Sequence, residues 1–246
     1  MQNIIKELEA ITRLGYSTHT VFIDWLDLML YALTADDENY LAIVKSYDND
    51  REKGRRPIDH FTKAFALLMV EMQKTNNEIL GEIYMILGVN NMHLSQYFTP
   101  APICDFMARI VGSGKGNAID PACGTGAMLI ARAKITTSED LYDSVFYGQD
   151  IDYTCVKMTA LNMLFFNLNG FAICGNTLAF EARSAYQTVR TPIGGMIKKL
   201  SSEEVEILQE NMRAGLEKKS VIPFGGKQVE FKRDKKSVLE EQLSIF

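Results

Sequence analysis

Residues 119–127 decide the fold class of this 246-residue chain, and they read Ile119-Asp120-Pro121-Ala122-Cys123-Gly124-Thr125-Gly126-Ala127. The stretch ends a short apolar strand, 117–120, and opens a helix from about residue 126. Gly124 and Gly126 permit a tight turn and let a ligand approach free backbone amides at the helix N-terminus. Asp120, at the carboxyl end of the strand, can accept hydrogen bonds from a cationic group. The stretch therefore predicts a strand–loop–helix junction that binds a nucleotide-like ligand.

Short apolar strands alternate with helices on both sides of this junction. We expect further strands at 144–149 and 171–175, with a helix from about Tyr153 between them. This alternation is typical of βαβ units in a parallel, Rossmann-like sheet. Upstream, Thr99 is expected to cap a helix with Pro100 at its first position, and the helix ends at Gly112. One apolar face of that helix comprises Ile103, Phe106, Met107 and Ile110.

The first 93 residues show the three- and four-residue spacing of apolar side chains that predicts helices. Thr18 or Thr20 is expected to cap a helix over the apolar run 21–33, which is too short to span a bilayer. Asp36 or Asp37 opens the next helix, 49–57 is a loop, and 58–73 is helical. A further helix ends at Gly88, where a left-handed residue is favoured. We expect three parts: a helical domain 1–93, a Rossmann-like core 94–180, and a helix with a basic tail over 181–246.

Composition restricts the function classes. Hydrophobic residues make up 47% of the chain and charged residues 23%, as in ordinary globular proteins. The N-terminus has no signal-peptide pattern, and the four cysteines have no CxxC spacing, so we expect a cytoplasmic protein without disulfides or zinc. The net charge of −5 gives no support for nucleic-acid binding. Residues 213–236, however, carry eight basic and three acidic residues, either to contact phosphates or as a solvated tail.

Four segments resemble motifs of one enzyme family, in the family's order. DPACGTGAML (120–129) resembles motif I of the adenine-N6 DNA methyltransferases, most closely the modification subunits of type I restriction–modification systems. SQYFTP (95–100) resembles motif X, YGQDID (147–152) the segment that binds ribose, and CGNTL (174–178) motif III. The resemblance covers residues 94–180. It implies an α/β fold, in which a helical N-terminal region is followed by a partial Rossmann-like methyltransferase sheet.

The resemblance also implies S-adenosylmethionine as the cofactor. Phe98, Thr99 and Pro100 would flank one side of it, and the methionine end would lie against Asp120, Ala122, Cys123, Gly124 and Gly126. Asp150 would bind the ribose, with Ile151, Asn176 and Thr177 around the adenine. Taken alone, Asp150 would be a helix N-cap; the series of motifs favours the ribose role. Asn176 stands where the family usually has Asp, which weakens cofactor binding without excluding it.

The family's catalytic motif IV is degenerate in this chain. These enzymes use (Asn/Asp/Ser)-Pro-Pro-aromatic to bind the amine of a flipped adenine and to stack on its ring. The nearest stretch is Val221-Ile222-Pro223-Phe224-Gly225-Gly226-Lys227. Phe224 would still stack on the base, but valine offers no hydrogen-bond acceptor. We therefore expect weak or absent catalysis by this chain alone.

The sequence shows no run of strands after residue 180 and predicts a helix over 200–219. A three-stranded parallel sheet would leave its first strand as an apolar edge. We expect either that helix or a second subunit to cover it.

Two functions are compatible with these features. The first is a DNA adenine-N6 methyltransferase that binds S-adenosylmethionine, because the FTP segment favours DNA over small-molecule or protein substrates. The second is a non-catalytic module, or a remnant of a longer methyltransferase, that binds DNA, a methyltransferase or specificity subunit, or a second copy. The last five residues, Gln242, Leu243, Ser244, Ile245 and Phe246, resemble a peptide that binds the replication sliding clamp. They would otherwise be an apolar tail packed on its own domain.

Overall fold

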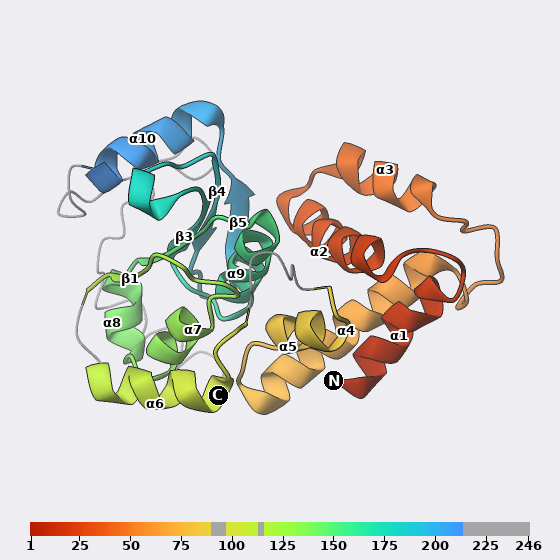
Figure 1. Ribbon diagram of the computed structural model, residues 1–246, viewed down its shortest axis with the longest axis horizontal. Helices are drawn as coiled ribbons and strands as arrows, with labels where there is room; N and C mark the ends of the chain where they lie inside the picture. Colours follow the sequence, from red (N-terminus) through yellow and green to blue (C-terminus); the bar gives the residue numbers. More distant parts are fainter. Residues whose placement is uncertain (90–96, 113–115, 214–246) are drawn as a thin grey trace, which may run out of the picture.

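The computed structural model describes residues 1–89, 97–112 and 116–213, and Figure 1 shows a helical part beside a sheet with helices on both faces. The helical part comprises α1 (Gln2–Thr12), α2 (Thr18–Thr34), α3 (Asp37–Ser46), α4 (Pro57–Thr75) and α5 (Leu80–Ile86). The second part comprises α6 (Ala101–Val111), β1 (Ala118–Asp120), α7 (Ala127–Lys134), α8 (Ser138–Asp143), β2 (Phe146–Asp150), α9 (Tyr153–Phe165), β3 (Gly170–Cys174), η2 (Thr177–Ala179), β4 (Ser184–Val189), β5 (Met196–Lys199) and α10 (Ser202–Arg213). The predicted fold class is confirmed.

Local capping chemistry sets the helix boundaries. Ser17 caps α2, since its hydroxyl accepts a hydrogen bond from the Thr20 amide at 3.0 Å, so neither Thr18 nor Thr20 is the cap. Asp36 caps α3 as predicted. Gly88 has a φ of 65°, the left-handed conformation expected there.

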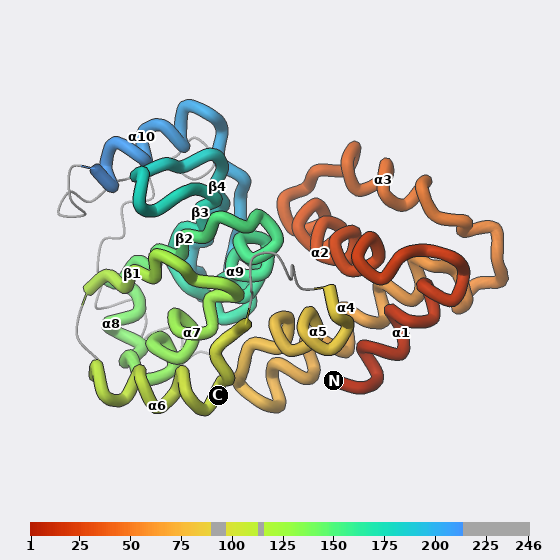
Figure 2. Tube along the Cα trace, viewed as in Figure 1, coloured from red at the N-terminus to blue at the C-terminus, as the bar shows by residue number. Residues whose placement is uncertain are grey.

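A single hydrophobic cluster joins the helical part to the sheet. Phe22 and Trp25 of α2 are almost fully buried, and they belong to the same cluster as Val156 of α9 and Tyr186 of β4. Figure 2 shows α9 between the sheet and α2. The predicted boundary at residue 93 therefore crosses a shared core, and the helical part packs directly on the part that carries the glycine loop.

The sheet has the order β1-β2-β3-β4-β5. β1, β2 and β3 are parallel, whereas β4 and β5 add antiparallel to β3. The prediction of a three-stranded sheet with no strand after residue 180 is wrong. The apolar pattern does not predict β4, because Gln187 and Thr188 are buried polar residues. It does not predict β5, because that strand is short and ends in two lysines.

The two faces of the sheet are covered by different helices. Leu129 of α7 and Met163 of α9 pack on one face with Phe146. Val205 and Leu208 of α10 pack on the other face with residues of β2, β3 and β4. The described part of the helix expected over 200–219 therefore covers a face, not the edge at β1. Ile119 of β1 remains 55% exposed, and no described residue lies beyond β1 in the strand order.

The apolar face predicted on α6 points outward. Its four residues are 44–69% exposed: Ile103, Phe106, Met107 and Ile110. The buried side of α6 carries small side chains, Cys104 and Ala108, which pack on Ala131 of α7. Small residues at i and i+4 let the two helices approach closely, so the larger side chains face away. The helix begins at Ala101 with Pro100 as N-cap, and Thr99 makes no side-chain cap. Within the described ranges, no helix has the length and hydrophobicity needed to cross a bilayer.

Candidate functional site

The loop between β1 and α7 needs its two glycines for both conformation and space. Gly124 and Gly126 have φ of 54° and 79°, in the left-handed region that side chains disfavour. A Cβ on Gly126 would lie 3.2 Å from Thr159, and one on Gly124 would lie 3.0 Å from the ring of Phe98. Phe98 of motif X therefore lies against the motif I loop.

Helix α9 holds the loop between β1 and α7 through side-chain hydrogen bonds to its backbone carbonyls. The Thr159 hydroxyl donates to the Gly124 carbonyl at 2.9 Å, and the Asn162 amide donates to the Thr125 carbonyl at 2.8 Å. Cys123 is buried with its Sγ 3.4 Å from Thr159 Oγ1, and burial raises the pKa of its thiol. The Cys123 side chain therefore serves packing, and only its backbone belongs to the loop surface.

Asp150, predicted to bind the ribose, lies at the carboxyl end of β2. One carboxylate oxygen accepts the Gly124 amide at 2.9 Å, and the other accepts the Asp152 amide at 2.9 Å. The N-cap of α9 is Asp152, which accepts from Thr154 at 2.8 Å, so the alternative role of Asp150 as a helix cap is wrong. Each carboxylate oxygen of Asp150 keeps a lone pair for a ligand.

Asp120 lies beside the same loop. Its Oδ1 accepts the Ala122 amide at 3.2 Å. Burial raises the pKa of the Asp120 carboxyl, and the nearby charge of Asp150 raises it further. A cation bound beside Asp120 would favour the charged form of this carboxyl.

The motif III loop is tied to the motif I loop. The Thr177 hydroxyl donates to the Pro121 carbonyl at 2.7 Å. The Asn176 side chain accepts from the Leu178 amide at 3.0 Å, and the backbone N–H of Asn176 donates to Glu181. The amide oxygen of Asn176 is thus already used within its own turn.

These loops enclose a cavity of about 230 Å³, lined by Pro121, Ala122, Asp150, Ile151, Gly175, Asn176, Thr177 and Leu178. Five of the predicted cofactor residues line it, while Phe98, Thr99, Pro100, Asp120, Cys123, Gly124 and Gly126 do not. Sequence reasoning missed three lining residues, although all three stand within quoted motifs: Pro121, Gly175 and Leu178. Phe224 with its degenerate motif, the basic tail beyond residue 213 and the clamp-like peptide 242–246 lie outside the described residues.

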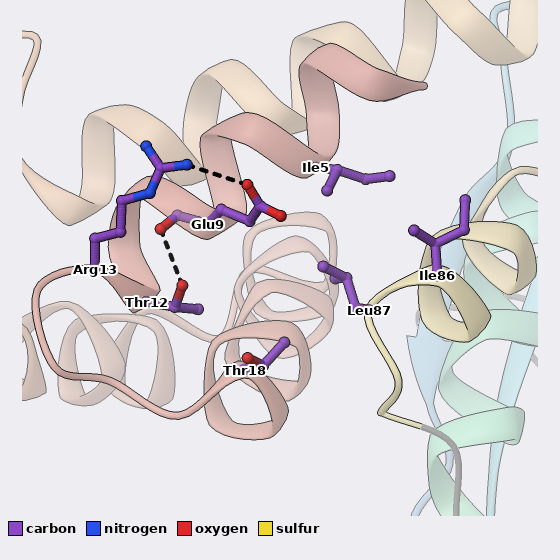
Figure 3. Close-up of a pocket in the computed structure, with 7 residues that line it drawn as sticks. All are labelled: Ile5, Glu9, Thr12, Arg13, Thr18, Ile86 and Leu87. Carbon is purple, nitrogen blue, oxygen red and sulfur yellow. Dashed lines mark hydrogen bonds and ion pairs between the residues drawn. The ribbon is translucent and has the colours of Figure 1, made fainter.

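A larger cavity of about 430 Å³ lies in the helical part, between α1 and the end of α5 (Figure 3). Three of its polar residues contact one another: Arg13 pairs with Glu9 at 3.2 Å, and Thr12 donates to the Glu9 carbonyl. None of its lining residues lies at the carboxyl end of a strand. Volume alone therefore does not make it the candidate site.

Residues 75–191 match the family model described as N-6 DNA Methylase, a range that contains every loop of the smaller cavity. This segment is similar to the N-6 DNA methylase family. The family predicted from the four motifs is confirmed.

Two curated relatives extend the comparison. The methylase subunit of the type I restriction enzyme MpnII of Mycoplasma pneumoniae is 30% identical over 108 residues, covering 40% of this chain and 20% of the relative. The HindI methylase subunit of Haemophilus influenzae is 27% identical over 93 residues, covering 35% and 21%. The matches span only about a fifth of the length of these N-6 DNA methylase relatives.

Two solved structures are also similar to parts of this chain. One is a modification subunit of a type I restriction enzyme from Vibrio vulnificus, with a TM-score of 0.30 and 23% identity over 39% of this chain and 22% of that one. The other is a type I methyltransferase subunit from Streptococcus thermophilus, with a TM-score of 0.33 and 17% identity over 62% and 37%.

Proposed function

We propose that this chain binds S-adenosylmethionine at the carboxyl ends of β1, β2 and β3 and takes part in adenine-N6 methylation of DNA. The observation that carries the proposal is the position of Asp150. Its carboxylate anchors the glycine loop through the Gly124 amide and still faces the cavity. A ribose diol bound there would receive charge-assisted hydrogen bonds from the same group that shapes the loop.

The residues present suit the chemistry of such a ligand. Asp120 and Asp150 provide negative charge for a sulfonium and an ammonium group, and Ile151 with Leu178 offers apolar contact for a purine. A cavity of about 230 Å³ is smaller than the roughly 300–1,000 Å³ of typical ligand pockets. It therefore suits the nucleoside portion, while the amino-acid portion would extend over the open side of the 120–124 loop.

Methyl transfer itself needs a group that this chain does not supply. The bound cofactor would provide the methyl group, and the protein must hold the adenine amine in line with it. The six prolines include no adjacent pair, so the sequence contains no Pro-Pro motif IV. We expect transfer only when another polypeptide, such as a methyltransferase or specificity subunit, supplies that part.

The first test is calorimetric titration with S-adenosylhomocysteine, the demethylated product. Asp150→Asn keeps the volume of the side chain but places an amide N–H₂ against the backbone N–H donors. We expect its affinity to fall by about tenfold or more. Asp37→Asn, in the exposed first turn of α3, is the matched control and should bind like the unmodified protein. An unmodified protein that neither releases heat nor gains thermal stability with this ligand would refute the proposal.

The second test is a tritiated methyl-transfer assay on mixed duplex DNA. The chain alone should transfer little or no label, and Val221→Asn tests whether residue 221 stands at the acceptor position. Robust transfer by the unmodified chain would show that the alignment of Val221 to the catalytic asparagine is wrong.

The exposed face of α6 and the open edge at β1 favour a second candidate, a non-catalytic module that binds a partner subunit. The first candidate requires cofactor binding, whereas the module would bind the cofactor only if it has kept the methyltransferase site. Binding without transfer, in the presence of DNA and the partner subunits, would favour the module.

A further inference from the structure

A buried carboxylate of the helical part contacts the glycine loop directly. Glu78 lies between α4 and α5 and is 8% exposed. Its Oε1 accepts the Thr125 hydroxyl at 3.1 Å, and its Oε2 accepts the Gly81 amide at 3.0 Å and the Asn162 side chain at 3.2 Å. Thr125 stands between the two loop glycines and is 47 residues away from Glu78 in sequence. The helical part therefore holds the loop through a specific polar contact.

The packing around this contact leaves no space. A Cβ on Gly81 would lie 2.8 Å from both Thr125 Cγ2 and Glu78 Oε1. Thr125 is 1% exposed, and Asn162 binds its carbonyl while Glu78 binds its hydroxyl. Thr125 is thus fixed at both its backbone and its side chain, and a change on α5 is transmitted to the loop.

An aromatic contact runs parallel to the polar one. Tyr84 of α5 packs on Phe98 with ring centroids 5.5 Å apart, and Phe98 lies against Gly124. Two consecutive loop residues are therefore supported from the helical part, Thr125 by a hydrogen bond to Glu78 and Gly124 through the ring of Phe98, which packs on Tyr84 of α5.

We propose that Glu78 is a positioning residue of the cofactor loop, so that ligand affinity depends on how the helical part holds Thr125. This inference rests on the proposed function for its ligand, but its geometry concerns the loop alone. Glu78 does not line the cavity and would act only through Thr125.

The charge state of Glu78 provides a signature that simple packing would lack. Its three donors in the described part of the chain are neutral, and burial raises the pKa of the carboxyl. The titratable groups that face it are Glu82 of α5, which raises that pKa further, and Cys104 of α6. As pH rises through the pKa of Glu78, an uncompensated charge forms beside the loop. We expect ligand affinity to fall over that range.

The experiment titrates S-adenosylhomocysteine into the full chain and its variants from about pH 5 to about pH 9, a range that includes the pKa of known buried glutamates. Glu78→Ala should bind about tenfold more weakly at low pH, the loss expected when a buried hydrogen-bond acceptor is removed. Glu78→Gln keeps an acceptor and a neutral group, so it should bind like the unmodified protein at low pH and lose the high-pH decline. Glu206→Gln, exposed on α10, is the matched control.

A second pair of variants tests the same contact without removing Glu78. Gly81→Ala should weaken binding because its methyl group displaces Thr125. Adding Thr125→Ser should restore part of the affinity, because the clash with Cγ2 is removed while the close contact with Glu78 Oε1 remains. Folding of each variant is checked by circular dichroism and thermal melting. Folded Glu78→Ala and Gly81→Ala proteins that bind like the unmodified chain would overturn the proposal. So would a Glu78→Gln protein that keeps the high-pH decline.

Hydrogen exchange of the ligand-free protein separates this inference from the proposed function. Glu78→Ala should accelerate amide exchange at Gly124 and Thr125, whatever ligand the loop binds. Faster exchange with no ligand binding by the unmodified protein would refute the cofactor and retain the positioning role. Unchanged exchange would refute the positioning role.

Discussion

Individual residues at the candidate site have structural roles in addition to the ligand-binding roles proposed for them. Asp150 illustrates this, because the carboxylate that holds the Gly124 amide also faces the cavity. The motif predicted its position correctly, but its two backbone partners are contacts that only folding creates. The replacement of Asp by Asn at position 176 can be judged only with the turn in view, since the amide oxygen is already accepting from Leu178.

Asp120 predicts a loss of cofactor affinity at acid pH. Because burial raises the pKa of Asp120 above 3.8, the carboxyl protonates at a higher pH than an exposed aspartate and then no longer attracts a cation. Asp120→Asn should bind more weakly at neutral pH and lack this acid decline. Titration calorimetry at several pH values is the measurement.

The contribution of Asp120 to folding stability changes with pH in the opposite direction to its contribution to cofactor affinity, and this difference provides the control. A raised folded-state pKa means that the contribution of Asp120 to stability is complete below its unfolded pKa and is lost as pH rises through the folded pKa. The acid loss of binding therefore should not coincide with unfolding caused by Asp120. A melting temperature that falls together with affinity in the unmodified protein but not in Asp120→Asn would contradict this account.

Gly126 offers a prediction about backbone strain. Gly126→Ala forces a side chain into the left-handed region and against Thr159, so we expect a loss of about 2–3 kcal/mol in unfolding free energy. Gly15→Ala has a φ of 102° with no atom near its Cβ, so it adds backbone strain without a steric contact and should lose about 1–2 kcal/mol. Urea denaturation compares the two, and equal losses would show that the contact with Thr159 contributes nothing.

At the scale of elements, α6 shows that periodicity identifies an apolar face without saying what covers it. The stripe from Ile103 to Ile110 has the spacing of a buried helix, yet the small side of the helix is the one that packs. We expect Phe106→Gln with Ile110→Gln to change stability by less than about 0.5 kcal/mol, because both side chains are already exposed. Ala108→Leu should cost about 1–3 kcal/mol, because it overfills the contact with α7.

Urea denaturation measures both changes on α6, and sedimentation velocity reports association. The double glutamine variant should also associate less with itself or with a partner subunit, since it removes exposed apolar surface. A large loss of stability in that variant would show that the stripe is covered.

At the scale of the whole molecule, one buried ion pair links the two parts. Lys157 of α9 contacts Asp27 of α2 at 2.6 Å, with side chains only 9% and 14% exposed. Burial raises the pKa of Asp27 more than Lys157 lowers it. The pair therefore matters chiefly because each charge would be costly without the other.

Lys157→Met should remove about 3 kcal/mol of stability near neutral pH, because it leaves the Asp27 carboxylate buried and unpaired. The loss should shrink at acid pH, where Asp27 is protonated. Adding Asp27→Leu should recover most of it. Arg13→Met, which breaks an exposed pair, should change stability by less than about 0.5 kcal/mol in the same urea titrations. Equal losses of stability in Lys157→Met and Arg13→Met would contradict the prediction.

The sequence alone determined the features that arise within a few residues of each other. The glycine loop, the caps at Asp36 and Gly88 and the parallel order of β1, β2 and β3 follow from backbone preferences and strand–helix alternation, which are local. Only the tertiary structure decided which faces meet: Glu78 with Thr125, Thr177 with Pro121, α6 with its small side inward, and two further strands after β3. These depend on contacts between residues distant in the chain, and the pattern of apolar and polar residues does not say which buried surface packs against which.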